Sequence, residues 1–208
     1  PDEVCIIPYT SGSTGVPKGC IHTHNTVNAV INAYARWLPI PKKSRVLTTL
    51  PLFHVTGMQN SMNVPIFNGN TIVLMTRWDI DTALFYIKKY RIKSWRSITA
   101  SIIDLVGEFK PIKHNIASLS SVGGGGASMP KSIALKLKKL TNLDYIEAYG
   151  LTETMAPTHI NPPHKTKLGS IGIPIFNVDA RIIDIDKNIE LGVNQVGELI
   201  ISSPQLFL

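Results

Sequence analysis

The feature that most constrains this chain is a loop rich in hydroxyls and glycines at residues 9–19, which reads Tyr-Thr-Ser-Gly-Ser-Thr-Gly-Val-Pro-Lys-Gly. It follows the apolar residues 4–7, and we expect residues 3–7 to form a buried strand. Glycine lets the backbone approach an anion, and hydroxyls, amides and an ammonium group donate hydrogen bonds to phosphate oxygens. A flexible Ser/Gly linker is the alternative, but a linker needs neither a preceding strand nor a lysine. The loop therefore predicts a polyphosphate site.

The loop differs from a Walker A motif, in which the lysine directly follows the second glycine. Here Val16 and Pro17 separate Gly15 from Lys18, and proline removes an amide donor. The glycine run at residues 123–126 lacks the last glycine of a dinucleotide-binding fingerprint. These differences disfavour kinases, GTPases and dinucleotide-binding proteins. A phosphate-loop hydrolase would need a Walker lysine and a base to orient water, and the sequence shows neither.

Apolar runs of strand length alternate with helical patterns along most of the chain. We expect strands at residues 46–50, 71–75, 98, 119–122 and 144–147, and helices at residues 25–38, 79–90, 101–109 and 131–140. Ser128 and Pro130 are expected to cap and open the last of these helices. The alternation predicts an α/β fold with a mostly parallel, covered sheet.

The pattern changes after residue 168, where strands are expected at residues 178–185 and 196–202 without a helix. We therefore expect two units: a partial α/β subdomain over residues 1–168, and a partial β-rich subdomain over residues 169–208. The chain starts without methionine and stops just after a strand, so we expect it to be a piece of a larger protein. Ligands gather at the carboxyl edge of parallel sheets, which predicts one crevice between residues 9–19, 123–126 and 149–154.

The formal net charge of +7 raises a basic nucleic-acid-binding module as an alternative. The lysines are spread along the chain, however, and the densest group, at residues 131–139, lies on a predicted helix whose other side is apolar. We therefore expect no nucleic-acid partner. Cys5 and Cys20 form no disulfide framework and are expected to be free thiols in the cytoplasm. No apolar run reaches the roughly 18 residues of a membrane span, and no signal peptide is evident.

Five segments together carry a resemblance to a known family, in the order that the family has them. The sequence resembles the adenylate-forming (AMP-binding) superfamily, which includes acyl-CoA synthetases, luciferases and peptide-synthetase adenylation domains. The resemblance is closest to the fatty-acid–CoA ligase type, spans nearly the whole chain and implies a central fragment of the N-terminal domain. The segments are residues 9–19, Leu-Pro-Leu-Phe-His at 50–54, Gly-Gly-Gly-Ala-Ser-Met-Pro at 124–130, Tyr-Gly-Leu-Thr-Glu-Thr at 149–154, and Gly-Ser-Ile-Gly at 169–172 with Val-Gly-Glu-Leu at 196–199.

The resemblance implies an enzyme that activates a carboxylic acid with ATP to acyl-AMP and then transfers the acyl group to CoA. Such chemistry needs positioning and charge neutralisation but no protein nucleophile. Glu153 would bind Mg²⁺, for which carboxylate oxygen is the right kind of ligand; a solvated surface acid is the alternative. The residues implied for the β- and γ-phosphates are Thr10, Ser11, Gly12, Ser13, Thr14, Gly15 and Lys18.

The resemblance also implies residues for the adenine and the acid. His54 would lie near the reacting carboxylate, and Thr152 would hydrogen-bond the α-phosphate or that carboxylate. Adenine would lie between Tyr149 on one side and Gly125, Gly126 and Ala127 on the other. The family often has Ala-Pro after its paired glycines, whereas residues 128–130 here read Ser-Met-Pro. His22 and His24 could be read as a pair of metal ligands, but no further Cys, His or carboxylate stands at the spacing of a zinc site. We therefore expect both to be structural residues near the helix start.

Several parts of the family pattern are missing, including a Tyr-x-Thr-Gly-Asp segment, a hinge to a C-terminal lid domain and a late lysine. We therefore expect the isolated chain to bind nucleotide weakly and to turn over negligibly. Exposed apolar surface would allow a homo-oligomer.

A fatty acid is the expected substrate, with CoA or a carrier thiol as acceptor. An aryl-acid ligase or an amino-acid adenylation domain is the alternative within the superfamily. The latter would need a pocket carboxylate for the amine, and none is identified. Four residues are candidates for an apolar acyl pocket or for ordinary core packing: Met58, Met62, Ile102 and Val106.

Overall fold

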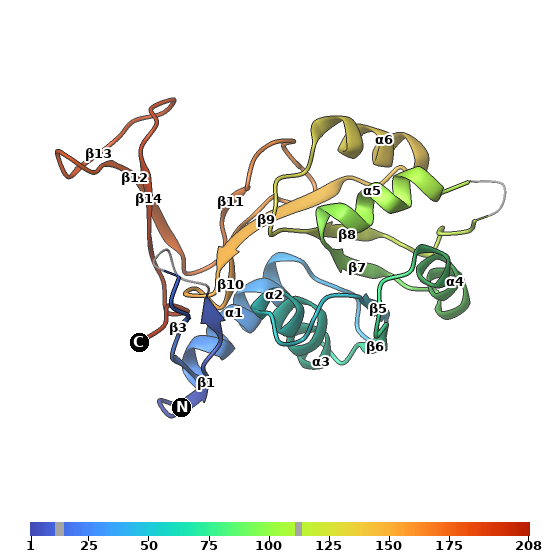
Figure 1. The fold of residues 1–208 in the computed structure, drawn as a ribbon, viewed down its shortest axis with the longest axis horizontal. Coiled ribbons are helices and arrows are strands. Elements are labelled where there is room, and N and C mark those ends of the chain that lie inside the picture. The colour runs from blue at the N-terminus through green and yellow to red at the C-terminus, as the bar shows by residue number, and fades with distance from the viewer. Residues whose placement is uncertain (11–14, 111–113) are drawn as a thin grey trace.

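The computed structural model describes residues 1–10, 15–110 and 114–208 and has a seven-stranded sheet at its centre (Figure 1). Its strand order is β11-β10-β9-β8-β7-β5-β6. The five strands from β6 to β9 in this order run parallel, whereas β10 and β11 pair antiparallel. The predicted α/β fold with a mostly parallel sheet is thereby confirmed. The strands are β5 (Arg45–Thr48), β6 (Thr71–Leu74), β7 (Ser94–Ser97), β8 (Ser121–Gly124), β9 (Tyr145–Leu151), β10 (Ala156–Ile160) and β11 (Ile173–Pro174).

Helices cover both faces of this sheet (Figure 1). One face carries α4 (Ile80–Tyr90), α5 (Thr99–Glu108) and α6 (Lys131–Thr141). The other carries α1 (His24–Trp37) and a continuous helical segment made of α2 (Val55–Met58), the π-helix η1 (Gln59–Asn63) and α3 (Val64–Phe67).

Side-chain caps define where two of the amphipathic helices, α1 and α4, begin. The Thr23 hydroxyl accepts a hydrogen bond from the Thr26 amide at α1, and the Asp79 carboxylate accepts one from the Thr82 amide at α4. Such caps satisfy backbone donors that have no partner inside the helix. The helices predicted at residues 25–38 and 79–90 are therefore confirmed to within one residue at each end.

The core consists of two apolar clusters, one on each face of the sheet. Trp95 is fully buried in the cluster under α4, α5 and α6, where it stacks on Trp78 with ring centroids 5.4 Å apart. Tyr34 and Ile146 belong to the cluster under α1. Met58 and Met62 pack in this second cluster, whereas Ile102 and Val106 pack in the first. The four candidate acyl-pocket residues therefore lie on opposite faces of the sheet, and core packing explains them.

Three local predictions are wrong. Residues 3–7 do not form a buried strand: β1 (Val4–Ile6) pairs only with β4 (His22–Thr23) at the periphery, and Val4 is 53% exposed. Ile98 lies outside β7 because its backbone begins α5 as the N-cap. Ser128 does not cap α6, whose N-cap is Pro130 without a side-chain hydrogen bond.

Besides the β1–β4 pair, the described part of the chain forms two further small sheets. β2 (Tyr9–Thr10) pairs with β3 (Lys18–Gly19), and β12 (Asp179–Asp184) lies between β13 (Ile189–Glu190) and β14 (Glu198–Ser202). The three-stranded sheet extends away from the main body (Figure 1). β11 still belongs to the large sheet, and the domain boundary at residue 168 stays a prediction.

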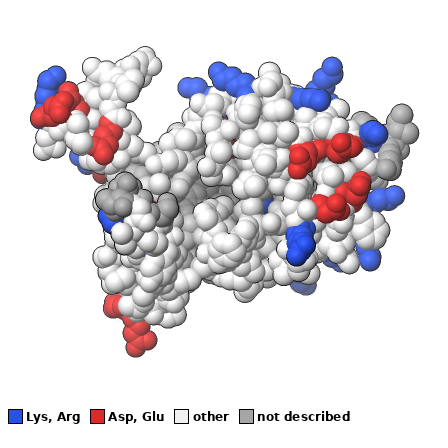
Figure 2. Space-filling view, in the orientation of Figure 1, with Lys and Arg blue, Asp and Glu red and all other residues white. Residues whose placement is uncertain are grey.

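Basic residues on the face shown in Figure 2 occur in separate places with acidic residues among them. Cys5 is exposed and Cys20 is buried, and both are free thiols. Within the described ranges, no helix has the length and apolarity needed to cross a membrane.

Candidate functional site

A cavity of about 360 Å³ opens at the carboxyl edge of the parallel strands. It lies where the turn after β8 meets the end of β9, as expected for neighbouring parallel strands. Its wall comes from four distant parts of the chain: residue 10, residues 54–60, residues 125–126 and residues 148–157. The predicted site residues among its lining are Thr10, His54, Gly125, Gly126, Tyr149, Thr152 and Glu153.

The phosphate loop reaches this cavity through Thr10. Thr10 pairs antiparallel with Lys18, so the backbone of the lysine lies beside the residue that lines the cavity. Gly15 has a φ of 80°, a left-handed conformation that glycine adopts without strain. Neither Gly15 nor Lys18 is part of the cavity wall itself. The other predicted loop residues, Ser11, Gly12, Ser13 and Thr14, lie outside the described residues.

The glycine turn after β8 passes close to the neighbouring strand. A Cβ atom on Gly125 would collide with the backbone carbonyl of Ala148 in β9, so the chain comes this near only because the residue is glycine. Gly126 has a φ of 89° and is exposed. Ala127 does not line the cavity; its carbonyl accepts a hydrogen bond of 3.2 Å from the Thr99 hydroxyl.

His54 begins the helical segment that forms one wall. Its Nδ1 accepts a hydrogen bond of 3.1 Å from the Thr56 backbone amide, so the side chain caps α2. In a neutral ring this leaves Nε2 as the N–H donor. His54 is exposed, and a donor at this position can bind an anion in the cavity.

A hydrogen bond from His22 supports the turn that carries Thr152 and Glu153. The fully buried His22 ring donates from Nε2 to the Thr152 carbonyl at 2.8 Å, and its Nδ1 lies 3.2 Å from the Thr26 hydroxyl. Burial lowers the pKa of His22, and the hydrogen bond to Thr152 and the charge of Glu153 offset part of this effect. The ring is therefore neutral in the folded protein and acts as a structural support, as predicted for a residue near the helix start.

Glu153 places a half-buried negative charge at this edge. Burial, followed by the Glu153 charge, raises the pKa of the Cys20 thiol. Among the described residues, no group of three or more His, Cys, Asp or Glu side chains is placed to bind a metal ion. A single carboxylate does not fit zinc, but it fits Mg²⁺, which usually takes one or two carboxylates and completes its shell with phosphate oxygens and water.

Sequence reasoning missed Gln205, which supports the same loop. Its buried side-chain amide donates to the carbonyls of Thr154 at 2.7 Å and Pro157 at 3.0 Å. The backbone amide of Phe207 also donates to the Glu153 carbonyl at 3.0 Å. A single glutamine outside every motif gives no sequence signal, because its partners lie about 50 residues away in the chain.

Tyr149, near the end of β9, also lines the cavity and is partly buried. Its ring meets the His159 ring edge to face, with centroids 6.1 Å apart. His159 is buried within β10, and burial lowers its pKa. The contact with His159 helps to hold the Tyr149 ring in place at the cavity wall.

Comparison with known proteins identifies the family. The model of a family described as "AMP-binding enzyme" matches residues 1–208. The chain therefore belongs to this family, the adenylate-forming superfamily.

Two curated relatives illustrate the similarity. The 4-coumarate-CoA ligase 1 of Narcissus pseudonarcissus is 30% identical over 216 residues, which cover 99% of this chain and 40% of the relative. The long-chain-fatty-acid–CoA ligase of Bacillus subtilis (strain 168) is 30% identical over 207 residues, which cover 98% of this chain and 37% of the relative. The chain thus spans about two fifths of the length of these relatives.

A solved structure shows the same fold. The O-succinylbenzoate coenzyme A synthetase of Bacillus subtilis, in complex with ATP and magnesium ion, superimposes with a TM-score of 0.87 at 25% identity. The superposition covers 97% of this chain and 41% of that one.

Proposed function

We propose that the complete protein containing this chain is an AMP-forming acid–thiol ligase that activates a fatty acid with ATP and transfers it to CoA. The observation that carries the proposal is the cavity at the carboxyl edge of the sheet. Residues from four separate segments face this one volume, and each segment bears a motif of the adenylate-forming superfamily. The relatives named as CoA ligases support the same class of reaction.

The first half-reaction joins an acid to the α-phosphorus of ATP. A carboxylate oxygen forms a bond to that phosphorus, the bond to the bridging oxygen of pyrophosphate breaks, and pyrophosphate leaves with the electron pair. His54 Nε2–H and the Thr152 hydroxyl are the donors that would orient the carboxylate and the α-phosphate. Lys18 would neutralise charge on the departing phosphates. These roles use positioning and electrostatics and require no covalent intermediate on the protein.

Glu153 is the residue that would hold Mg²⁺. The metal, when bound, supplies charge neutralisation on the phosphates. The structure of the B. subtilis synthetase in complex with ATP and magnesium ion supports ATP and Mg²⁺ as ligands of this site.

The second half-reaction would transfer the acyl group to CoA. The thiol sulfur attacks the carbonyl carbon of acyl-AMP, the bond from that carbon to the phosphate oxygen breaks, and AMP leaves. The thiol proton passes to solvent. The relatives named as CoA ligases favour CoA over a carrier thiol as the acceptor.

The acid is assigned to the fatty-acid class on the strength of the long-chain relative, because the apolar residues first considered for an acyl pocket lie in the core. An aryl acid is the second candidate, because the 4-coumarate relative is equally similar at 30% identity.

Pyrophosphate release by the complete protein, measured with Mg-ATP and CoA across octanoate, palmitate and 4-coumarate, tests the proposal. The highest kcat/KM is expected for one of the two fatty acids. A preference for 4-coumarate would replace the fatty acid with an aryl acid and leave the reaction class intact. Absence of release with every acid would contradict the function itself.

A further inference from the structure

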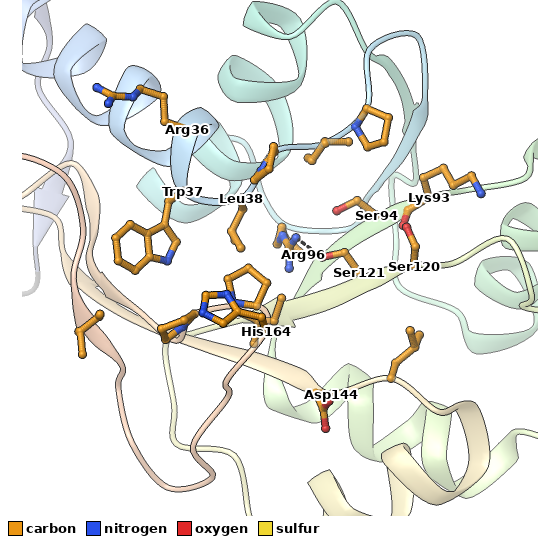
Figure 3. Close-up of a pocket in the computed structure, with 18 of the residues that line it drawn as sticks. Arg36, Trp37, Leu38, Lys93, Ser94, Arg96, Ser120, Ser121, Asp144 and His164 are labelled. Carbon is orange, nitrogen blue, oxygen red and sulfur yellow. Dashed lines mark hydrogen bonds between the residues drawn. The ribbon is translucent and has the colours of Figure 1, made fainter.

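A second and larger cavity, of about 900 Å³, lies at the opposite, amino edge of the sheet (Figure 3). Its wall is formed by the end of α1 with residues 38–41, by the first residues of β7 and β8 and the turn before β9, and by residues 162–164 with Ile173 and Phe176. None of the predicted adenylation residues that the structure describes lines it. Its volume is in the range of about 300–1,000 Å³ that small-molecule sites have.

Arg96 enters this cavity from β7 with most of its hydrogen-bonding capacity unused. The residue is only 3% exposed, and its Nη2 donates to the Ser121 hydroxyl at 2.6 Å (Figure 3). Within residues 1–10, 15–110 and 114–208, its Nε and Nη1 make no hydrogen bond of good geometry, and no carboxylate forms an ion pair with it. A guanidinium has five N–H donors and stays charged. Burying it without an anion is costly, so its environment indicates a missing anionic partner.

Two tyrosine phenols, Tyr34 and Tyr145, respond to this charge, and neither compensates it. Burial, followed by the charge of Glu147, raises the pKa of Tyr145, and the charge of Arg96 offsets part of that rise. Burial raises the pKa of Tyr34, and the charge and hydrogen bonding of Arg96 offset part of that rise. The Tyr34 phenol is therefore not ionised near neutral pH and does not compensate the guanidinium.

The other charges around the cavity also favour an anion. Arg36, Lys93 and Arg96 line it. Among the described residues of its wall, Asp144 is the one carboxylate, and it is already paired with Lys138 at 2.8 Å. An anion that enters therefore meets a positive potential that the wall does not itself neutralise.

An apolar wall lies beside the guanidinium. The Trp37 ring meets Phe176 edge to face at 5.4 Å, and Leu38 and Ile146 add aliphatic surface. The indole Nε1 of Trp37 is buried and makes no hydrogen bond within the described part of the chain. The cavity thus combines a cation with an apolar surface and a spare neutral donor, which together match a carboxylate on a hydrocarbon body.

We propose that this cavity binds a small organic acid, whose carboxylate pairs with Arg96 and whose apolar body packs against Trp37 and Phe176. Ser121, which fixes the guanidinium, is four residues before Gly125 in the adenylation cavity, a separation of about 13 Å along extended chain. A carboxylate held at Arg96 is therefore not the one that meets the phosphate loop. This is a second acid site, and it does not depend on the proposed ligase activity.

Octanoate is a suitable probe, with octanol as an uncharged control of equal length. The chain has three tryptophans, so ¹⁵N-labelled protein gives three indole N–H signals. Trp78 and Trp95 stack on each other in the cluster on the opposite face of the sheet and serve as internal references. Without ATP or Mg²⁺, octanoate is expected to shift the Trp37 signal saturably, with at least tenfold higher affinity than octanol. Inorganic phosphate is expected to shift it less than octanoate.

Variants separate this site from the adenylation site. Arg96→Met removes the donors while retaining length, and is expected to weaken octanoate binding at least tenfold while the Trp78 and Trp95 signals stay in place. Arg96→Lys keeps the charge but loses the planar fork that suits carboxylates, and an intermediate loss is expected. Glu153→Gln, at the other edge, is expected to leave octanoate binding unchanged.

Equal affinities for octanoate and octanol, or an Arg96→Lys variant that folds and binds octanoate as tightly as the wild type, would overturn the proposal. A phosphate response as strong as the octanoate response would also overturn it, because the apolar body would then contribute nothing. The ligase proposal is untouched by each of these results.

Discussion

The side chain of Gln205 donates a hydrogen bond of 2.7 Å to the backbone carbonyl of Thr154, so the last residues of the chain fasten the loop that carries Glu153. The same amide group lies 3.0 Å from the Pro157 carbonyl. One buried side chain thus satisfies an acceptor within the turn between β9 and β10 and another in β10 itself. The position of Glu153 depends on residues that lie outside the cavity and outside every recognisable motif.

Gln205→Ala is expected to destabilise the fold by about 1–3 kcal/mol, because buried carbonyl oxygens then lack a donor. Chemical denaturation of the two proteins measures the difference. Gln195→Ala, at an exposed glutamine, is the matched control and should change stability by less than about 0.5 kcal/mol. Equal effects of the two substitutions would show that the Gln205 hydrogen bonds contribute nothing to stability.

Removal of the charge at Glu153 tests its role in the cavity. In the complete protein, Glu153→Gln is expected to lower kcat/KM for pyrophosphate release by about 100-fold and to raise the Mg²⁺ concentration required, as for loss of a group that organises transition-state charge. Glu198→Gln, at an exposed acid in β14, serves as the control. An unchanged Mg²⁺ requirement in Glu153→Gln would remove this residue from the metal site.

Lys18→Ala addresses the phosphate loop. Loss of the ammonium group is expected to lower kcat/KM by about 10²–10³-fold, because charge on the leaving pyrophosphate is then less well neutralised. Lys42→Ala removes an exposed lysine that does not line the adenylation cavity and should leave the rate unchanged. A similar rate in both variants would argue against phosphate binding by Lys18.

The two buried histidines predict how stability depends on pH. Burial holds the folded-state pKa values of His22 and His159 below their ordinary value of 6.5. The unfolded chain therefore binds more protons near pH 6. The folded state, which buries the two neutral rings, is therefore fully stable above pH 6.5 and loses free energy of unfolding as the pH falls and the rings take up protons. Denaturation between pH 7.5 and 5 should show a falling free energy of unfolding, with a shallower slope in His159→Gln. An identical slope in that variant would exclude His159 as a source of the pH dependence.

Gly124 is expected to tolerate no side chain. An added Cβ would collide with the backbone carbonyl of Ser97 on the neighbouring strand, so Gly124→Ala should cost about 1–3 kcal/mol or more through overpacking. Gly107 lies within α5 with no atom within 4 Å of an added Cβ, and Gly107→Ala should stabilise the protein by up to about 1 kcal/mol. Thermal unfolding of the two variants compares them, and a stabilised Gly124→Ala would contradict the close approach.

The sheet and its longer helices could be predicted because their periodicity is local. α1 and α4 show an apolar stripe and a capping residue within one segment of sequence. η1 and β10 were missed because they bury polar side chains, such as Gln59 and Thr158, at positions where sequence pattern suggests a loop. Their burial depends on partners that are distant in the chain.

In the candidate site, too, residues in local motifs could be predicted, whereas contacts between distant segments could not. Residues such as Tyr149 and Glu153 belong to short motifs and were predicted, and the structure brings them to one cavity, while their chemical roles stay predictions. Gln205 and the hydrogen bond from His22 to Thr152 connect segments about 50 and 130 residues apart, which no local pattern specifies. The cytoplasmic location and a homo-oligomer also stay predictions.

The π-helix η1 has a mechanical consequence for the wall that it forms. A wide turn accommodates one more residue than an α-turn, so it offsets the faces of the helical segments before and after it. Val55, Thr56 and Asn60 can therefore line the cavity while Val64 is fully buried in the core beyond. Deleting one residue within Gln59–Asn63 would restore a regular spiral and rotate one of these two faces by about 100° relative to the other. The extra residue of η1 therefore determines by what angle the side chains that line the cavity are rotated from those that pack in the core.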